Sequence, residues 1–240
     1  MPRTLAIGDI HGYLNALEAL VELVAPKSED TLITVGDYVD RGPDSAGVIE
    51  WLIKRFDAGQ LVPLRGNHDI MMLDALDGGE WAGRWQSFGG DTTLESYRQR
   101  GFDPEKDGLP ERHRRFLESD CRKIHVTDHH FFVHAFAHFR RPLDDQPDDI
   151  VYWEKWESRA HPPPHVSGKT MVCGHTAQKN GWPLTIGHAI CIDTWVYGKT
   201  GWLTCLDVDS GEVWQARENG ETRTGWLDQK PGESTGRFNA

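Results

Sequence analysis

The sequence has 240 residues, with 26 Lys and Arg against 37 Asp and Glu and a formal net charge of −11. This length fits one large domain, or one domain with a small insertion. An acidic surface repels phosphate backbones, so the charge argues against broad binding to a nucleic acid polymer. No stretch approaches the ~18 consecutive apolar residues of a membrane span, which argues against a membrane partner.

The first 76 residues alternate short apolar runs with helical periodicity. The pattern predicts, in chain order, a strand at 4–7, a helix at 14–24, a strand at 31–35, a helix from Pro43 to about 53, a strand at 61–64 and a helix at 69–76. Each strand ends in a polar cluster: Gly8-Asp9, Gly36-Asp37 and Arg65-Gly66-Asn67-His68-Asp69. Because open α/β sheets bind ligands beyond the carboxyl ends of their strands, we expect these clusters to converge.

The pattern changes after Gly78, where charged and Trp-bearing segments mix. We interpret residues 78–120 as a helical insertion or cap beside the site. Further apolar runs predict strands at 131–133, 169–173, 188–192, 202–208 and 212–215, and the turn sequence Asp209-Ser210-Gly211 joins the last two. The Pro-rich segment 161–165 should be a rigid loop. We expect a domain from 1 to 218 and a loose polar tail from 219 to 240.

The cysteine pattern indicates neither a zinc site nor a disulfide framework. Cys121, Cys173, Cys191 and Cys205 form no C-x-x-C motif. We therefore expect reduced, buried thiols in a cytoplasmic protein. The first candidate catalytic residue is Asp9, which leaves no room for a preceding signal peptide.

Residues that could bind metals follow several of the apolar runs. They are Asp9, His11, Asp37, Asn67, His134 and His175. A single Asp in such a place is more often a helix cap, and a single His is more often a hydrogen-bonded core residue. Five such clusters in order argue against that explanation. Oxygen donors mixed with imidazoles suit Mn, Fe or Zn, and this set can hold two divalent cations roughly 3.5–4 Å apart.

Three motifs are specific enough to indicate a family. They are Gly8-Asp9-Ile10-His11-Gly12, Gly36-Asp37-Tyr38-Val39-Asp40-Arg41-Gly42 and Arg65-Gly66-Asn67-His68-Asp69. With Gly174-His175-Thr176 and Ile192-Asp193-Thr194, they resemble the signature of the phosphoprotein phosphatase superfamily of calcineurin-like metallophosphoesterases. That superfamily includes Ser/Thr protein phosphatases and symmetrical diadenosine tetraphosphate hydrolases. The resemblance implies an α/β fold, a four-layer αββα sandwich of two mixed β-sheets.

The resemblance also implies a role for each motif residue. Asp9, His11 and His175 would bind the first metal, Asp37 would bridge both metals, and Asn67 and His134 would complete the second site. A metal-bridging hydroxide would attack phosphorus in line. His68 would protonate the leaving oxygen and Asp40 would orient it. Arg41 and Arg65 would clamp the phosphate.

Other histidines are expected to lie in the core or at its rim. Because His175 already fills the Gly-His-Thr position, we do not expect His188 to bind a metal. The same expectation holds for His138, His161 and His165.

The sequence departs from the family pattern at two positions. The second-metal histidine is followed by Ala135-Phe136, where the family has a glycine. A third phosphate-binding arginine is replaced by Lys155 in Trp153-Glu154-Lys155. Lys155 would bind phosphate as a point charge, unless Arg140, Arg141 or Arg159 takes that role.

Three functions are compatible with this sequence. Hydrolysis of phosphomonoesters, foremost phosphoserine and phosphothreonine proteins, is the leading hypothesis. The second is a symmetrical bis(5'-nucleosyl)-tetraphosphate hydrolase, for which Trp81, Trp85 and Phe88 could form a base platform, although such spacing also suits a packed helix face. The third is an inactive phosphate-binding module. The sequence argues against it, because every expected metal ligand is present, as are His68 and Asp40.

Overall fold

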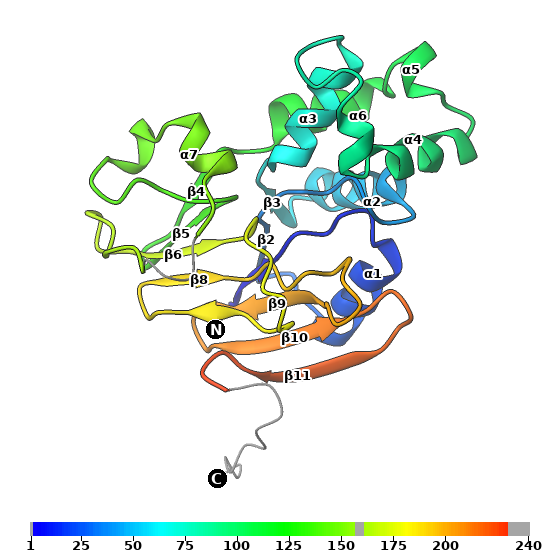
Figure 1. The fold of residues 1–240 in the computed structure, drawn as a ribbon. Helices are drawn as coiled ribbons and strands as arrows, with labels where there is room; N and C mark the ends of the chain where they lie inside the picture. The colour runs from blue at the N-terminus through cyan, green and yellow to red at the C-terminus, as the bar shows by residue number, and fades with distance from the viewer. Residues whose placement is uncertain (1, 157–160, 230–240) are drawn as a thin grey trace.

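A computed structural model describes residues 2–156 and 161–229. Two β-sheets pack face to face (Figure 1). The first sheet has six strands in the order β11 (Thr222–Trp226), β10 (Glu212–Ala216), β9 (Leu203–Asp207), β1 (Thr4–Ile7), β2 (Thr31–Thr34) and β3 (Leu61–Pro63). The second has five in the order β4 (Ile124–Val126), β5 (His130–Val133), β6 (Thr170–Cys173), β8 (Ala189–Cys191) and β7 (Leu184–Thr185).

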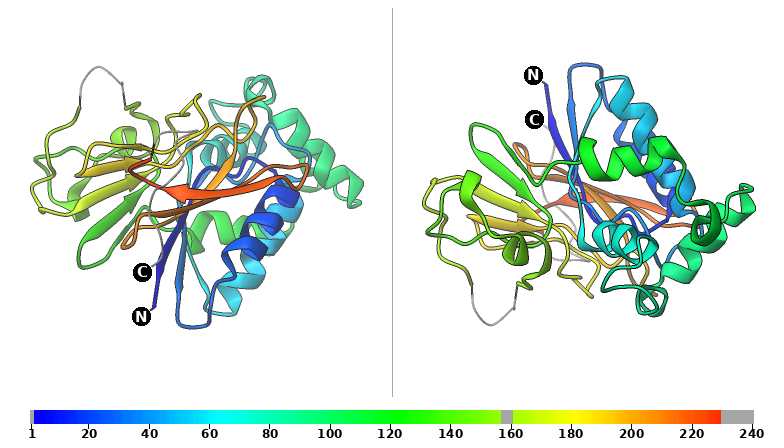
Figure 2. Two further views of the ribbon diagram at one scale, coloured as in Figure 1. Left: turned by 90° about the horizontal axis from the view of Figure 1, so that it is seen from below. Right: turned by 90° about the horizontal axis from the view of Figure 1, so that it is seen from above.

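Helices cover the outer face of each sheet. On the first sheet, α1 (Leu14–Val24) contacts β9 and β10, and α2 (Ser45–Asp57) contacts β3. Figure 2 shows α1 and α2 on the side of this sheet that faces away from the second one. The second sheet is covered by a short helix, α7 (Asp148–Trp153), next to the turn η3 (Leu143–Asp145). The expected αββα sandwich of two mixed sheets is confirmed.

Apolar side chains between the sheets join the two halves of the chain. Ala6, Ile33 and Leu206 from the first sheet pack with Phe132 and Val172 from the second, and all five are buried. These residues alternate along their strands with others that face the helices, as expected for strands buried on both faces.

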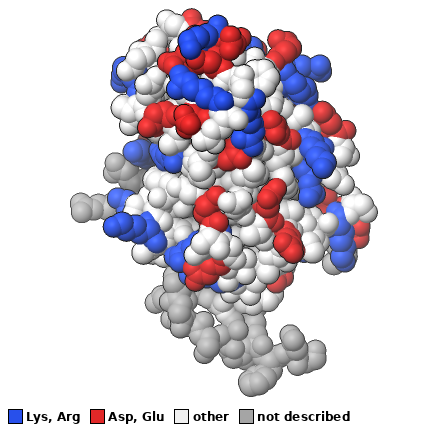
Figure 3. Space-filling model, turned by 90° about the vertical axis from the view of Figure 1, so that its right-hand side faces the viewer, with Lys and Arg blue, Asp and Glu red and all other residues white. Residues whose placement is uncertain are grey.

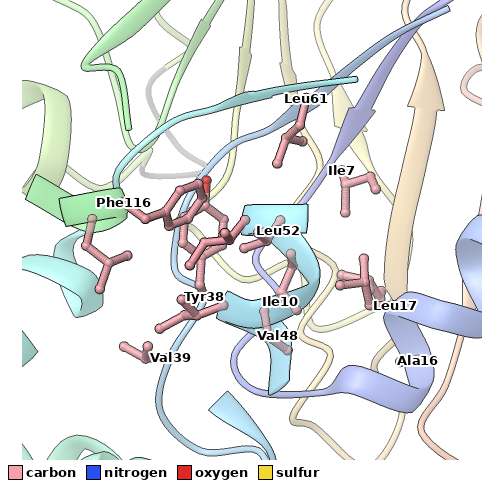
Figure 4. Packing of buried hydrophobic residues seen from close by; sticks show 14 of the residues in the cluster. Ile7, Ile10, Ala16, Leu17, Tyr38, Val39, Val48, Leu52, Leu61 and Phe116 are labelled. Atoms are coloured by element: carbon pink, nitrogen blue, oxygen red, sulfur yellow. The ribbon is translucent and has the colours of Figure 1, made fainter. Parts of the chain in front are cut away.

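The segment 78–120 is helical and packs into the core. It contains η1 (Trp85–Phe88), α4 (Gly90–Gln99), α5 (Pro104–Asp107), α6 (Glu111–Arg115) and η2 (Phe116–Asp120), and it follows α3 (Asn67–Leu76). The ring of Phe116 is fully buried 6.1 Å from that of Tyr38 (Figure 4). The insertion is therefore anchored beside the loop that follows β2.

Parallel pairing brings the candidate residues to one edge of the sandwich. Strands β1, β2 and β3 are parallel, as are β5, β6 and β8. Their carboxyl ends carry Asp9, Asp37, Asn67, His134 and His175. The convergence expected from the sequence is present in the fold.

The surface mixes charges of both signs. Figure 3 shows Lys and Arg interspersed with Asp and Glu over the face that includes the insertion. Arg98, for example, lies 2.6 Å from Glu105, and Arg114 lies 2.8 Å from Asp77. Among residues 2–156 and 161–229, no helix has the length and apolar character needed to cross a bilayer.

The expectation of a loose tail from residue 219 is wrong for its first part. Residues Thr222–Trp226 form β11, which pairs antiparallel with β10 from Glu212↔Trp226 to Ala216↔Thr222. Arg223 reinforces this pairing, donating from Nε to Gln215 at 2.6 Å and from Nη2 to the Gly181 carbonyl at 2.6 Å. A polar sequence forms this strand because its main contacts are backbone pairs and one half-buried arginine. The rest of the expected tail, from 230, lies outside the described residues.

We expect Arg223→Met to destabilise the protein by about 1–3 kcal/mol, because Gln215 Oε1 loses its donor and the Gly181 carbonyl loses one of its two donors. The free energy of unfolding in urea measures this loss. Arg141→Met is the control, since Arg141 forms only a surface pair with Asp145 and should contribute under about 0.5 kcal/mol. Equal effects of the two substitutions would show that the Arg223 side chain adds nothing to the backbone pairing of β11.

Candidate metal centre

The site residues lie in tight turns directly after the strands. His11, Asp37, Asp40, Arg41 and His175 all have positive φ, between 49° and 75°. Non-glycine residues seldom adopt this left-handed region, and they do so most often at functional sites. The turns point several polar side chains into one place, and the surrounding backbone contacts offset the local strain.

Asp37 lies between two groups of possible ligands. Its Oδ2 is 3.6 Å from His11 Nε2, and its Oδ1 is 3.4 Å from His134 Nε2. One candidate group combines Asp37 with His11 and His68, and the other combines it with His134 and His175. This shared position is the one expected for a bridging carboxylate.

His175 lies in the group opposite to the one expected from the sequence. Its Nδ1 is 2.9 Å from Asn67 Oδ1, and His134 Nε2 is also 2.9 Å from that oxygen. The expected partners Asp9 and His11 are not in its group. Only the backbone N–H of His175 meets Asp9, at 3.0 Å from Oδ2. The sequence order of the motifs did not reveal which way this imidazole points.

Backbone carbonyls fix the orientation of three imidazoles. His11 Nδ1 lies 2.9 Å from Val39 O, His134 Nδ1 lies 2.9 Å from Val35 O, and His175 Nε2 lies 3.2 Å from Trp153 O. A carbonyl can only accept, so these nitrogens carry the protons. The opposite nitrogen of each ring is left with a lone pair, as in metal-binding histidines. Those of His134 and His175 face Asn67, and that of His11 meets the Arg41 guanidinium beside Asp37.

Burial keeps these imidazoles neutral. It lowers the pKa of His11 and His134, and burial together with His134 lowers the pKa of His175 to about 4. Burial alone would raise the pKa of Asp37, but the positive charge that the surrounding imidazoles carry when protonated, that of His134 first, lowers it below its usual range. A carboxylate among neutral imidazoles is the donor set that a divalent cation requires.

Two further carboxyl groups lie close to Asp37. Burial, followed by the charges of Asp193 and Asp37, raises the pKa of Asp9 well above its usual value. Burial also raises the pKa of Asp193 to about 6. Three carboxyl groups packed in a buried space repel one another, and bound cations would relieve that repulsion. The donors present therefore fit a metal centre.

His68 and Asp40 form a buried pair beside these groups. His68 Nδ1 is 2.6 Å from Asp40 Oδ2, as expected from the sequence. Trp85 Nε1 donates to both Asp40 oxygens, at 2.9 and 3.0 Å, and Thr93 Oγ1 donates to Oδ1 at 2.9 Å. Trp85, considered above for a base platform, is thus buried and bound to Asp40. Its indole supports the His68–Asp40 pair.

Comparison with known proteins identifies the family. The model of calcineurin-like phosphoesterases matches residues 2–193. The chain belongs to this family. Its members' shared scaffold explains why the site residues follow β1, β2, β3, β5 and β6.

Related proteins carry two kinds of name. Serine/threonine-protein phosphatase 1 of Salmonella typhimurium is 37% identical over 86 residues, covering 31% of this chain and 38% of that protein. A symmetrical bis(5'-nucleosyl)-tetraphosphatase of Legionella pneumophila is 38% identical over 97 residues, covering 38% of this chain and 30% of that protein. The chain thus spans well under half the length of these relatives.

Solved structures match over nearly the whole chain. One described as a "putative diadenosine tetraphosphatase" is 27% identical, with a TM-score of 0.64, and the match covers 94% of this chain and 96% of that one. A cold-active protein tyrosine phosphatase has a TM-score of 0.61 at 17% identity, covering 93% of this chain and 78% of its own. The second match shows the shared fold alone.

The two arginines expected to bind phosphate lie in different places. Arg41 lines the pocket above Asp37, and its guanidinium lies 2.8 Å from His68 Nε2 and 4.2 Å from the centre of the Tyr197 ring. Arg65 instead donates to the carbonyl of Glu118 in the insertion and does not line the pocket. In this structure the insertion supplies the acceptor of Arg65, and phosphate binding by Arg65 stays a prediction.

Among the possible third cations, Lys155 lines the pocket. Arg140 lies over Phe139 and Arg141 pairs with Asp145, so neither faces the site. Arg159 lies outside the described residues.

The remaining histidines lie away from the ligand groups. His188 Nε2 is 2.7 Å from Pro162 O, and His165 Nδ1 is 2.9 Å from Ser167 Oγ. Within the described ranges, His138 and His161 also belong to neither group of possible ligands. The rings of His188 and His165 thus have hydrogen-bond partners of their own, and the expectation that none of the four binds a metal stays a prediction.

Asp69 braces the loops that carry the ligands. Its Oδ2 accepts from Asp37 N at 3.1 Å and Gly66 N at 2.8 Å, and its Oδ1 accepts from Tyr38 N at 3.0 Å. Burial, then the charge of Asp37, raises the pKa of Asp69 to about 8, and the hydrogen bonds from Gly66 and Tyr38 act in the opposite sense. In the sequence, Asp69 stands out only as the last residue of the Arg65–Asp69 motif.

We expect Asp69→Asn to lower the free energy of unfolding by about 1–3 kcal/mol, because an amide nitrogen would face at least one backbone donor. Urea denaturation measures the loss. Calorimetric titration with Mn²⁺ should also show weaker binding, since Asp37 is no longer held in position. Asp77→Asn is the control, because Asp77 is exposed and pairs with Arg114 at the surface. A loss no larger than that of the control would contradict this role.

Proposed function

We propose that this protein is a dimetal phosphomonoesterase. The observation that carries the proposal is the pair of ligand groups that share Asp37, next to the buried His68–Asp40 pair. Metal centres of this kind hydrolyse phosphate esters by in-line displacement. The family match supports the same class of reaction.

We propose one set of ligands for each metal. Asp9, His11 and Asp37 would bind the first cation, and Asp37, Asn67, His134 and His175 would bind the second. The mixed oxygen and imidazole donors favour Mn, with Fe or Zn as alternatives. Bound cations would supply Lewis-acid activation of water and of the phosphoryl oxygens.

The roles of the protein's own groups follow from their geometry. His68 would donate a proton from Nε2 to the leaving oxygen, while Asp40 accepts from Nδ1 and stabilises the charged ring. Arg41 would bind the phosphate oxygens, since its guanidinium lies beside His68. Lys155 at the pocket rim would add positive charge.

Two substrate classes have support. Phosphoserine and phosphothreonine proteins are the leading class on sequence grounds, and two relatives are named serine/threonine-protein phosphatases. Symmetrical dinucleoside tetraphosphates are the second, supported by the 27% identical structure that matches almost the whole chain. An inactive phosphate-binding module is disfavoured, because the pocket retains His68, Asn67 and His175.

We expect manganese-dependent release of phosphate from p-nitrophenyl phosphate, with loss of turnover in a chelator. Asp9→Asn should lower kcat for p-nitrophenyl phosphate by about 100-fold or more, because a metal ligand is lost. His68→Asn should lower kcat for a phosphoserine peptide by a similar factor, because the proton donor is lost. His188→Asn is the control, since His188 binds only Pro162 O, and it should stay within about twofold of wild type. Wild-type-like turnover of the stated substrate by either of the first two variants would remove the mechanism.

The substrate class is tested with a phosphoserine peptide and diadenosine tetraphosphate at matched concentrations. Faster phosphate release from the peptide would support a protein phosphatase. Faster conversion of the dinucleotide to two diphosphates would support the second class and leave the metal ligands as proposed.

The support that Trp85 gives to Asp40 leads to a separate prediction. Trp85→Phe removes the indole donor, so His68 should lose its fixed orientation. We expect kcat/KM for a phosphoserine peptide to fall about 10-fold, since its alkoxide leaving group needs a proton. The value for p-nitrophenyl phosphate, whose leaving group needs none, should change under about twofold.

Trp182→Phe is the matched control for this experiment. Trp182 is also buried, and its Nε1 has no hydrogen-bond partner in the described part of the chain. It should affect the two substrates equally. Equal effects of Trp85→Phe on both substrates would mean that Trp85 acts only on stability.

A further inference from the structure

The pocket above Asp37 is larger than a phosphate group requires. It has a volume of about 430 Å³, within the range of sites for small organic ligands. His11, Asp37, Asn67, His68 and His175 line it together with residues from the insertion and from α7. The lining residues other than the candidate metal ligands are therefore placed to contact the organic group to which the phosphate is attached.

One wall of this pocket is aromatic. Trp81 and Trp153 stack with ring centres 5.5 Å apart and planes 3° apart, and Phe88 meets Trp81 edge-on at 5.6 Å. Phe88 is 44% exposed, so a large part of its side chain is not buried in the core. We call Trp81, Phe88 and Trp153 the aromatic wall. Of these three residues, Trp81 and Phe88 were candidates for a base platform on sequence grounds, and Trp153 was not.

The aromatic wall is attached to the phosphate-binding side of the site. Arg41 N donates to the carbonyl of Gly89, the residue after Phe88, at 3.1 Å. Gly89 has φ of 107°, and a Cβ there would lie 2.6 Å from Arg41 N. This close approach fixes the backbone of Phe88 next to that of Arg41. The distance from aromatic ring to bound phosphate is thereby set by the fold.

Cations complete the pocket. Lys155 and Lys179 are exposed and line the pocket. Arg41 also lines it, next to His68. A ligand that suits this surface is an anion that also carries a flat apolar group. Aromatic side chains bind flat rings by stacking, and stacking tolerates many kinds of ring.

We propose that the pocket binds phosphate esters that carry a planar aromatic ring, and that the ring packs against the aromatic wall. This inference rests on the proposed function, because it names the substrate class of the same site. A nucleobase and a tyrosyl ring share this chemistry. Both differ from phosphoserine, which the sequence alone favoured.

The test compares ligands that differ only by the ring or its carrier. Inhibition constants are measured against glycerol 2-phosphate, a ring-free reporter substrate, with manganese present. AMP is compared with ribose 5-phosphate, and phosphotyrosine with phosphoserine. In the wild type, at least one ring-bearing ligand should bind on the order of 10-fold tighter than its ring-free partner.

Phe88→Ala should remove most of this advantage, and Phe88→Trp should retain it. Phe102→Ala is the matched control: Phe102 lies in the same insertion, is 46% exposed and does not line the pocket. An advantage of AMP that depends on Phe88 identifies a nucleobase as the occupant. The same dependence for phosphotyrosine identifies a tyrosyl ring.

Equal binding of ring-bearing and ring-free ligands by the wild type would overturn the inference, as would an advantage that survives Phe88→Ala. Failure of the proposed function looks different, because no phosphate ester would then be hydrolysed with any metal. Calorimetric binding of AMP and ribose 5-phosphate to the wild type and Phe88→Ala would still decide whether the wall binds a ring.

Discussion

The geometry of the site depends on one buried carboxylate that joins two loops. Asp69 accepts backbone hydrogen bonds from Asp37, Tyr38 and Gly66, so the turn after β2 and the start of α3 are held together. His68 N in turn donates to Asp37 Oδ1 at 2.9 Å. The central carboxylate of the site and its neighbours on α3 are thus positioned by the backbone. Side-chain freedom contributes little to their placement.

The insertion connects substrate binding to the catalytic pair. Its indole at Trp85 and its hydroxyl at Thr93 hold Asp40, while its Phe88 lines the pocket. Phe116 buries the end of the same segment in the core against Tyr38. Because it contributes no metal ligand to either candidate group, this segment can change between relatives without changing the metal chemistry. Its sequence therefore bears on substrate choice.

Sequence predicted the fold and the identity of the clustered residues, because strand ends are visible as apolar runs followed by Asp, Asn or His. It did not predict side-chain direction. His175 was assigned to the wrong group, since its ring is turned by contacts with Trp153 O and Asn67. Nor did it reveal that Arg65, expected to bind phosphate, donates to the carbonyl of Glu118, far along the chain. Strand β11 was missed because backbone pairing, which composition does not report, stabilises it.

The buried carboxyl groups of the site repel one another when no cation is bound, and the same repulsion favours cation binding. Burial raises the pKa of Asp9 and of Asp193, while it lowers the pKa of the imidazoles at His11 and His134. Both shifts disfavour the charged forms. A nearby dication reverses the shift of the carboxyl groups, because it stabilises their anions, and it reinforces the shift of the imidazoles, because it binds their neutral lone pairs. The fold supplies the rigidity, through Asp69 and the backbone carbonyls, that keeps these groups together despite their repulsion. The repulsion among these groups lowers the stability of the protein without metal, and it favours cation binding at the edge of the sandwich where the strands end.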